Sequence, residues 1–278
     1  MKKLIAILLA LCTILSICML ASCNDASNAA DDDDDDKKSS SSTKTEETLY
    51  DIYAAAAKKM DEAKTVKSVI TQSEKKNTLG TVSTSSTEMN MTLDVNNTEK
   101  PMMYIDAKAT TSGMTMDMDV YYDGEYMYVS MMGMGYKQKV SFDEAQDSSG
   151  SFDITKVPKE LFDAAKSEKN EDGSRKITIN ITNDQFKTSY KEILLRHFAD
   201  VISGEDLTNV SVKDAKIEIA IADGFITAYS INYKAEYTVG TDVISYEISE
   251  SAVLSDYNKP VTITPMEGYK NFSEIDAK

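Results

Sequence analysis

The strongest constraint on the fold is an alternation of apolar and polar residues with a period of two, which recurs along most of the chain after residue 68. This pattern occupies residues 89–95, 114–122, 177–181, 217–221, 225–239 and 244–248. Side chains of a β-strand point alternately to its two faces, so each stretch predicts a strand with one apolar face. Strands that keep the other face polar are typical of an antiparallel sheet with one solvated side.

Turn residues join several of these predicted strands. An Asp-Gly pair at 123–124 separates the 114–122 stretch from the next strand, at 125–130, and predicts a hairpin whose turn needs positive φ. Turns at 223–224 and 240–242 divide the last third of the chain into long strands, which we expect to end in the segment 260–265. One face of the 225–239 strand is expected to carry Phe225, Thr227, Tyr229, Ile231, Tyr233, Ala235, Tyr237 and Val239.

Other segments repeat apolar residues at helical spacing. The first helix is predicted from Leu49, Ile52, Tyr53, Ala56, Met60 and Ala63. A short helix is expected over 159–165, behind Pro158. A longer helix is expected from Phe186 to Ile202, with Asn183 or Asp184 as its N-cap and Gly204 at its C-terminal end. Helices combined with one-sided strands predict an α+β fold with a single sheet.

The N-terminus has the pattern of a secretory signal segment over residues 1–22. Lys2 and Lys3 precede an apolar run of about 17 residues, which is at the short edge of the ~20 that a membrane-spanning helix needs. The tetrapeptide Leu-Ala-Ser-Cys that ends at Cys23 resembles the lipobox of bacterial lipoproteins. That resemblance implies a diacylglyceryl group on Cys23 and a lipid tether to the outer face of the cell membrane. An uncleaved anchor and ordinary secretion are the alternatives.

Residues 23–45 are predicted to be a lipidated cysteine followed by a flexible linker. Six aspartates at 31–36 and four serines at 39–42 leave almost nothing apolar to bury. Removal of residues 1–22 leaves 28 basic against 46 acidic residues, a formal charge of −18, which disfavours nucleic acid as a partner. Because Cys12 and Cys18 lie in the removed segment, the domain expected over 46–278 has no disulfide and no thiolate metal site.

The order of these elements carries a family resemblance. A helix, hairpins with a Tyr-Tyr-Asp-Gly turn at 121–124, a helical crossover and long final strands follow the lipobox. This order resembles that of uncharacterised Firmicute lipoproteins related to the LolA, LolB and LppX/LprG superfamily, over about residues 49–272. The resemblance implies a strongly curved antiparallel sheet, or half-barrel, with helices packed on its concave face around an apolar cavity. Members carry acylated molecules, which implies a hydrophobic or lipid-like ligand.

Methionine concentrates in the predicted hairpins, where 11 of the chain's 15 methionines lie between Met89 and Met134. Unbranched thioethers suit a deformable apolar wall, but they are also soft ligands for Cu(I). We expect the cavity to be lined by Met89, Met91, Met114, Met116, Met118, Phe186, Tyr190, Leu194 and Phe198. Cu(I) binding by the methionine-rich strands, and a structural or regulatory interaction module of the cell envelope, are the alternative functions.

No residue pattern indicates catalysis. The chain has one histidine, His197, which we expect to pack beside the sheet at a helix boundary. It contains no phosphate-binding glycine loop, zinc-helix motif or nucleophile elbow. We therefore expect a non-enzymatic binding protein without cofactor or metal, and the sequence indicates no particular protein partner.

Replacing Cys23 with serine is expected to abolish lipid attachment, because the hydroxyl does not substitute for the thiol that receives the diacylglyceryl group. The full chain, expressed in a bacterial host fed an alkyne-tagged fatty acid, should carry label that Cys23→Ser loses. The matched control, Cys18→Ser, should label like the unchanged chain. Label that persists in Cys23→Ser would contradict the lipobox interpretation.

Overall fold

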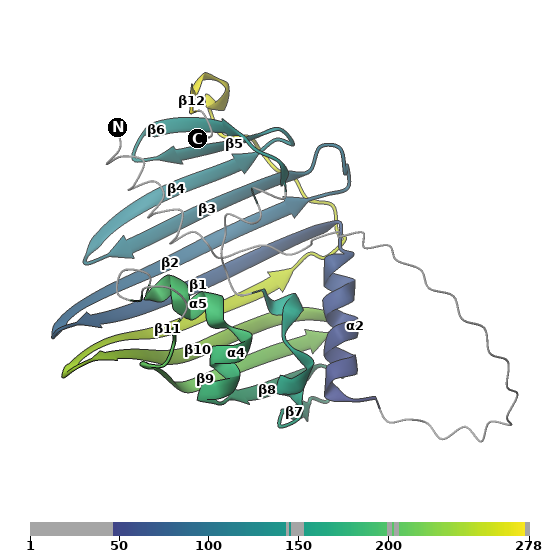
Figure 1. The fold of residues 1–278 in the computed structure, drawn as a ribbon. Helices are drawn as coiled ribbons and strands as arrows, with labels where there is room; N and C mark the ends of the chain where they lie inside the picture. Colours follow the sequence, from purple (N-terminus) through teal and green to yellow (C-terminus); the bar gives the residue numbers. More distant parts are fainter. Residues whose placement is uncertain (1–46, 143–144, 146–152, 199–201, 203–205, 276–278) are drawn as a thin grey trace, which may run out of the picture.

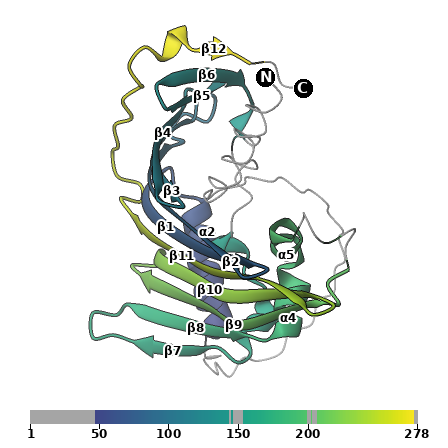
Figure 2. The ribbon, with the colours of Figure 1, turned by 90° about the vertical axis from the view of Figure 1, so that its left-hand side faces the viewer.

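The computed structural model describes residues 47–142, 145, 153–198, 202 and 206–275. These residues form one 12-stranded sheet with the order β12-β6-β5-β4-β3-β2-β1-β11-β10-β9-β8-β7. The sheet is strongly curved and open, and its helices lie on the concave side (Figures 1 and 2). The predicted α+β half-barrel is confirmed.

The strands fall into two meanders that meet at β1 and β11. Strand bounds are β1 Thr65–Thr78, β2 Thr81–Asp94, β3 Met102–Thr111, β4 Met114–Tyr122, β5 Tyr126–Met131, β6 Met134–Lys139, β7 Lys166–Lys169, β8 Arg175–Ile181, β9 Val210–Ala222, β10 Phe225–Val239, β11 Asp242–Ser255 and β12 Ser273–Glu274. Neighbouring strands pair antiparallel, except that β12 runs parallel to β6. The Asp-Gly hairpin between β4 and β5 is confirmed, with Gly124 at φ 97°.

The core lies between the concave face of the sheet and the elements that cover it. On β1, Val66 and Ile70 are buried, whereas Lys67 and Val69 between them are exposed. Strands β8 and β9 contribute four inward isoleucines that have no exposed surface: Ile177, Ile179, Ile217 and Ile219. Burial of each such side chain contributes about 1.5–3 kcal/mol to the free energy of unfolding, so these strands stabilise the fold.

Helix α2 (Leu49–Asp61) begins at a capping box, in which the side chains of Thr48 and Asp51 each accept a hydrogen bond from the other residue's backbone N–H. Its Tyr53 hydroxyl donates to the carbonyl of Ile154 (2.8 Å) and accepts from the N–H of Val157 (2.7 Å). These two bonds fix the 3-10 helix η1 (Ile154–Lys156) against α2. The short helix predicted over 159–165 is instead a 3-10 helix, η2 (Lys159–Phe162), and strand β7 begins at Lys166.

The single long helix predicted from Phe186 to Ile202 is wrong. Two short helices, α4 (Asn183–Ser189) and α5 (Lys191–His197), meet at Tyr190, whose φ of −128° and ψ of 33° are not helical. The bend lets both segments follow the curved sheet, with Phe186 on the ring of Tyr233 and Phe198 on the ring of Tyr246. Gly204, the predicted C-terminal position, lies outside the described residues.

The N-cap of α4 is Thr182 and not Asn183 or Asp184. Thr182 and Gln185 form a second capping box, which satisfies the first-turn N–H groups. The side chain of Asn183 is engaged elsewhere, since its carbonyl oxygen accepts the backbone N–H of Val212 at 2.9 Å. This bond ties the start of α4 to β9.

Strand β10 departs from strict alternation. An irregularity in its pairing with β9 between Ile226 and Ala228 shifts the pattern, so Ile226 is fully buried and Phe225 does not share the face of Tyr229. Phe225 stacks on Tyr257 instead. The last long strand, β11, ends at Ser255, and residues 260–265 form no strand. Pro260 and Pro265 lack the N–H that a paired strand supplies.

Ile219→Ala should lower the free energy of unfolding by about 2–5 kcal/mol, because it leaves a cavity in the most buried part of the sheet. Val253→Ala is the matched control on β11, where the side chain is exposed, and should cost less than about 1 kcal/mol. Urea unfolding curves measure both values. Equal losses in the two variants would contradict the placement of the core.

Candidate functional site

The residues predicted to line a cavity lie mainly in one buried apolar cluster. Met89, Met91, Met118, Phe186, Leu194 and Phe198 are buried, and Met116 and Tyr190 pack partly buried against them. Met114 differs: it is the first residue of β4 and its side chain is 70% exposed. The structure therefore brings eight of the nine together, and the lining of a cavity by these residues stays a prediction.

Register aligns four methionines in one row of the concave face. Met89 on β2 pairs with Ala107 on β3, which in turn pairs with Met118 on β4. Met118 pairs with Met131, and Met131 pairs with Met134. Directly opposite residues have Cβ atoms about 4.5–5.5 Å apart, so Met118, Met131 and Met134 are neighbours across adjacent strands. The sequence prediction omitted Met131, although its spacing from Met127 on a short strand was a signal.

A polar row lies beside this methionine row on the same face. Gln72 on β1 pairs with Thr87 on β2 and with Glu250 on β11. Thr87 and Glu250 are buried, each 4% exposed, and the hydroxyl of Tyr229 donates to Oε1 of Glu250 at 3.1 Å. Burial raises the pKa of Glu250 to about 7, while the Tyr229 bond opposes that rise. The sequence signal for Glu250 was a charged residue at an inward position between Ile248 and Ala252.

His197 ends helix α5 and joins it to the sheet, as predicted for a histidine at a helix boundary. Its Nε2 lies 2.6 Å from the hydroxyl of Tyr233, and its ring packs on Tyr246. Its Nδ1 lies 3.9 Å from Oε2 of Glu74, on β1. Burial raises the pKa of the Glu74 carboxyl, and the charge of Lys76 opposes that rise. Because 3.9 Å exceeds hydrogen-bond distance, the carboxylate does not orient the ring as a catalytic triad requires.

The polar groups of the concave face suit hydrogen bonding better than metal binding. Among the residues that the structure describes, no three His, Cys, Asp or Glu side chains are grouped closely enough to hold a metal ion. The face instead combines apolar rows with carboxyl, amide and hydroxyl groups. Such a combination can bury an apolar body and hold a few polar atoms in fixed positions.

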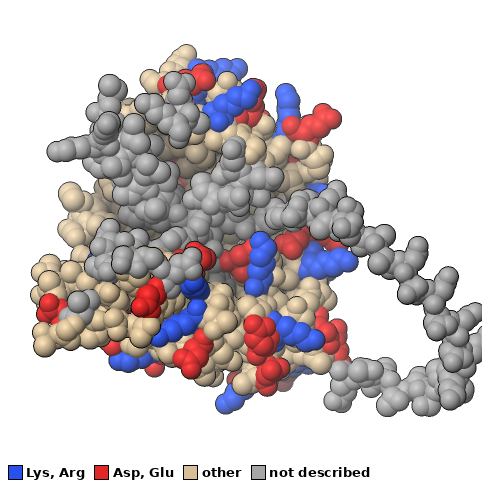
Figure 3. Space-filling model, in the orientation of Figure 1, with Lys and Arg blue, Asp and Glu red and all other residues tan. Residues whose placement is uncertain are grey.

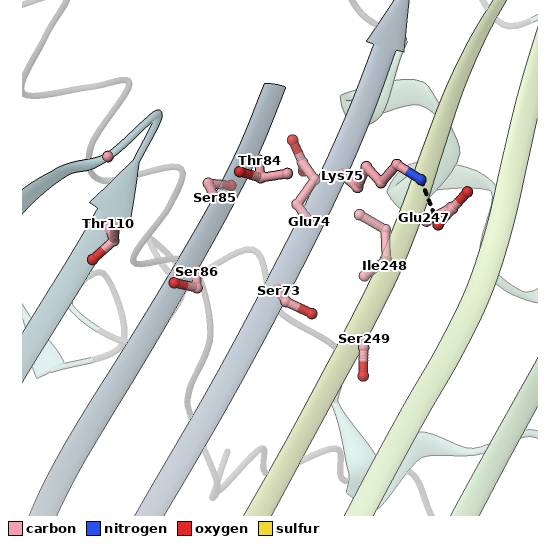
Figure 4. A pocket seen from close by; sticks show the side chains of 11 residues that line it. Ser73, Glu74, Lys75, Thr84, Ser85, Ser86, Thr110, Glu247, Ile248 and Ser249 are labelled. Atoms are coloured by element: carbon pink, nitrogen blue, oxygen red, sulfur yellow. Dashed lines mark hydrogen bonds and ion pairs between the residues drawn. The ribbon is translucent and has the colours of Figure 1, made fainter. Parts of the chain in front are cut away.

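The convex face carries a shallow hollow of about 400 Å³ across β2, β1 and β11 (Figure 4). It is lined by Ser73, Glu74, Lys75, Thr84, Ser85, Ser86, Thr110, Gly113, Glu247, Ile248 and Ser249. Lys75 forms an ion pair with Glu247 at 3.5 Å. A neighbouring hollow of about 320 Å³ shares Ser73, Ser86, Thr110 and Ser249. None of the nine predicted lining residues contributes to either hollow. The serine and threonine hydroxyl groups that line the two hollows suit a polar partner.

Charges of both signs are interspersed on the side of the molecule shown in Figure 3. The described ion pairs, such as Lys58 with Glu62 and Lys156 with Asp153, join neighbouring positions at the surface. Exposed pairs of this kind contribute little to stability. No helix in the described part of the chain has both the length and the apolar character needed to cross a membrane.

Solved structures resemble this chain only at low sequence identity and low TM-score. No family profile matches the chain, and no curated protein matches its sequence. LprF from Mycobacterium bovis is 12% identical, with a TM-score of 0.39 over 77% of this chain and 94% of LprF. A DUF1329 family protein from Desulfovibrio piger is 11% identical, with a TM-score of 0.25 over 78% of this chain and 95% of the other.

Glu250→Gln should change how stability depends on pH. The raised pKa means that the folded state holds a proton which the unfolded state releases above its ordinary pKa of 4.5. The stability that Glu250 contributes is therefore fully present below pH 4.5 and is lost as the pH rises through about 7. Relative to Glu250→Gln, the unchanged chain should lose up to about 3 kcal/mol across this window. Urea unfolding at several pH values measures the difference, and parallel curves would contradict it.

Proposed function

We propose that the chain is an extracytoplasmic lipoprotein, tethered by Cys23 to the outer face of the cell membrane, that binds a hydrophobic or lipid-like ligand on its concave face. The proposed activity is binding without bond chemistry. Residues 46–278 would form the binding domain, and residues 23–45 would connect it to the lipid. Two acyl chains on one cysteine are enough for a stable tether, whereas one chain binds a membrane only marginally.

The observation that carries the proposal is the continuous apolar row across the concave face. From β11 to β6 the paired residues are Ala252, Ile70, Met89, Ala107, Met118, Met131 and Met134. Helices α2, α4 and α5 lie on the concave side of the β7–β11 half of the sheet, and the β3–β6 half curves over that side (Figure 2). A methionine-rich wall adapts to ligands of different shape, because the side chain is unbranched and polarisable.

Apolar burial would supply the binding free energy for an acyl chain. Burial of apolar surface contributes about 25 cal/mol per Å², or about 0.8 kcal/mol per methylene. A dozen buried methylenes would thus contribute about 10 kcal/mol before the cost of ordering the ligand is subtracted. The remaining free energy would allow the ligand to bind without any charged contact.

Two observations favour the alternative functions. The hydroxyl-lined hollow of the convex face would suit a polar partner if the protein serves as an interaction module of the cell envelope. The adjacent thioethers of Met118, Met131 and Met134 supply the soft ligands that Cu(I) prefers. Both alternatives predict a different bound species from the lipid proposal.

Native mass spectrometry of the chain from Asn24 onward, secreted by bacterial cells, distinguishes these functions. This chain keeps every described residue. The proposal predicts an added mass that fragments as a lipid and is lost on denaturation. Met116→Asp places a carboxylate on a partly buried edge of the apolar cluster and should reduce the lipid-bound fraction at least tenfold.

Met132→Asp is the matched control, because the Met132 side chain is 69% exposed and lies outside the cluster. It should retain the lipid. A mass shift that matches copper would favour the Cu(I) alternative. Lipid retained equally by Met116→Asp and Met132→Asp would contradict the placement of the binding face.

A further inference from the structure

Four β-hairpin turns lie at the same end of the sheet, along its left side in Figure 1. They join β1 to β2, β3 to β4, β5 to β6 and β10 to β11. The register of β1 with β11 places Thr78 beside Ile244, so the first and last of these turns are neighbours. We call this set of turns, residues 77–82, 111–114, 131–134 and 239–243, the hairpin rim.

The hairpin rim exposes large apolar side chains to solvent. Leu79, at the tip of the first hairpin, is 64% exposed. Single exposed apolar residues are ordinary on protein surfaces, whereas their concentration in one place marks an interaction site. Six of the nine highly exposed large apolar side chains in the described part of the chain belong to the rim: Leu79, Val82, Met114, Met132, Met134 and Val243.

The rim is also depleted of charge, although 27% of the residues in the chain are charged. Among the rim residues only Asp242 carries a charge. The turns at the opposite end of the sheet differ, because each has at least one charged residue: Glu99 and Lys100, Asp123 and Glu125, Glu171 and Asp172, and Asp223. The two ends of the sheet therefore present different surfaces to their surroundings.

Two of the exposed apolar residues occupy backbone positions that favour other amino acids. Leu79 and Met132 have φ of 52° and 53°, and each precedes a glycine of positive φ. Tight hairpin turns of this kind favour Asn or Asp at the first position, because left-handed φ is unfavourable for bulky side chains. The turn between β9 and β10 follows that preference, with Asp223 at φ 54° before Gly224. Leu79 and Met132 thus work against the local fold, which indicates a role outside it.

A lipid bilayer is the partner that this combination fits best. Apolar side chains on separate turns can each enter the boundary between head groups and acyl chains, about 5–10 Å deep. A bilayer needs no shape complementarity, whereas a stable protein interface buries about 800 Å² on each partner. The rim is divided among four narrow turns and has no basic residue. Apolar insertion, and not attraction to anionic lipid, would therefore hold it at the membrane.

The tether of the proposed function is long enough to allow this contact. Helix α2, near the start of the described chain, lies at the end opposite the rim, where Nζ of Lys59 donates to the carbonyl of Asp223 at 2.6 Å. The 23 residues from 24 to 46 can span at most about 80 Å. Strand β1, with 14 residues, is about 46 Å long. A domain tethered through Cys23 can therefore turn its rim toward the same membrane.

We propose that the hairpin rim contacts the surface of a lipid bilayer and inserts its apolar side chains among the head groups. Leu79, Met114 and Met132 are the leading residues. The contact orients the domain with this end of the sheet on the membrane. It goes beyond the proposed function, because it depends neither on the lipid at Cys23 nor on what the concave face binds.

Flotation of the chain from Asn24 onward with phosphatidylcholine vesicles tests the proposal. This chain keeps every described residue and lacks the lipid tether. The double variant Leu79→Asn with Met132→Asn removes two leading apolar side chains and should bind the vesicles at least tenfold more weakly. Because Asn suits left-handed φ, the midpoint of its thermal unfolding should not fall. That second measurement separates loss of the contact from loss of the fold.

Val253→Asn is the matched control, because it introduces the same side chain at an exposed apolar position. Val253 is 58% exposed and lies on β11 near Ser255, away from the rim. This variant should float like the unchanged chain. Added salt should leave the flotation of the unchanged chain in place, since salt screens charges and the rim has no basic residue.

The outcomes separate this inference from the proposed function. Equal flotation of the double variant and the unchanged chain would overturn the assignment to the rim, and flotation lost at high salt would overturn apolar insertion. No flotation of the unchanged chain would overturn the inference and leave the tether and the ligand of the proposed function standing. If that chain instead forms a dimer that the double variant does not form, the rim binds a second copy and the bilayer proposal is wrong.

Discussion

The pairing of β1 with β11 is the constraint on which the rest of the structure depends. These strands lie about 180 residues apart in sequence, yet they pair antiparallel over twelve positions, from Lys67 with Ser255 to Thr78 with Ile244. The pairing joins two meanders into one sheet and makes their concave faces continuous. A slip of one residue would turn the inward side chains of one meander to the opposite face. The same register brings Glu250 beside Gln72, so both the apolar row and the polar row of the concave face follow from it.

The curvature of the sheet then determines where the other elements pack. Helices α2, α4 and α5 cover the half formed by β7–β11, where the fully buried isoleucines lie. The β3–β6 half contributes the buried methionines Met103, Met118 and Met131. Rigid β-branched residues therefore form the stable part of the core, and flexible thioethers form the part to which we assign binding. Under the proposed function, stability and binding depend on different strands of one continuous sheet.

Sequence patterns predicted those parts of the fold that depend on local periodicity. Alternation located most of the long strands, and the Asp-Gly pair located the β4–β5 hairpin. The same reasoning failed where contacts between residues distant in sequence determine the local structure. These places are the break at Tyr190, the irregularity near Ile226 and the short strands β7 and β12. Eight of the nine predicted lining residues lie in or against the cluster. The polar row of Gln72, Thr87 and Glu250 was not predictable, because it requires the register between β1 and its two neighbouring strands.

Photocrosslinking tests the central claim, that the concave face holds the acyl chains, most directly. A diacylglycerol with a diazirine in the middle of one acyl chain would be bound to the chain from Asn24 onward, irradiated and mapped by peptide mass spectrometry. The account predicts crosslinks at the inward residues of β2, β4 and β5, around Met89, Met118 and Met131. Crosslinks at the convex residues Ser73, Ser86 and Thr110 would contradict it.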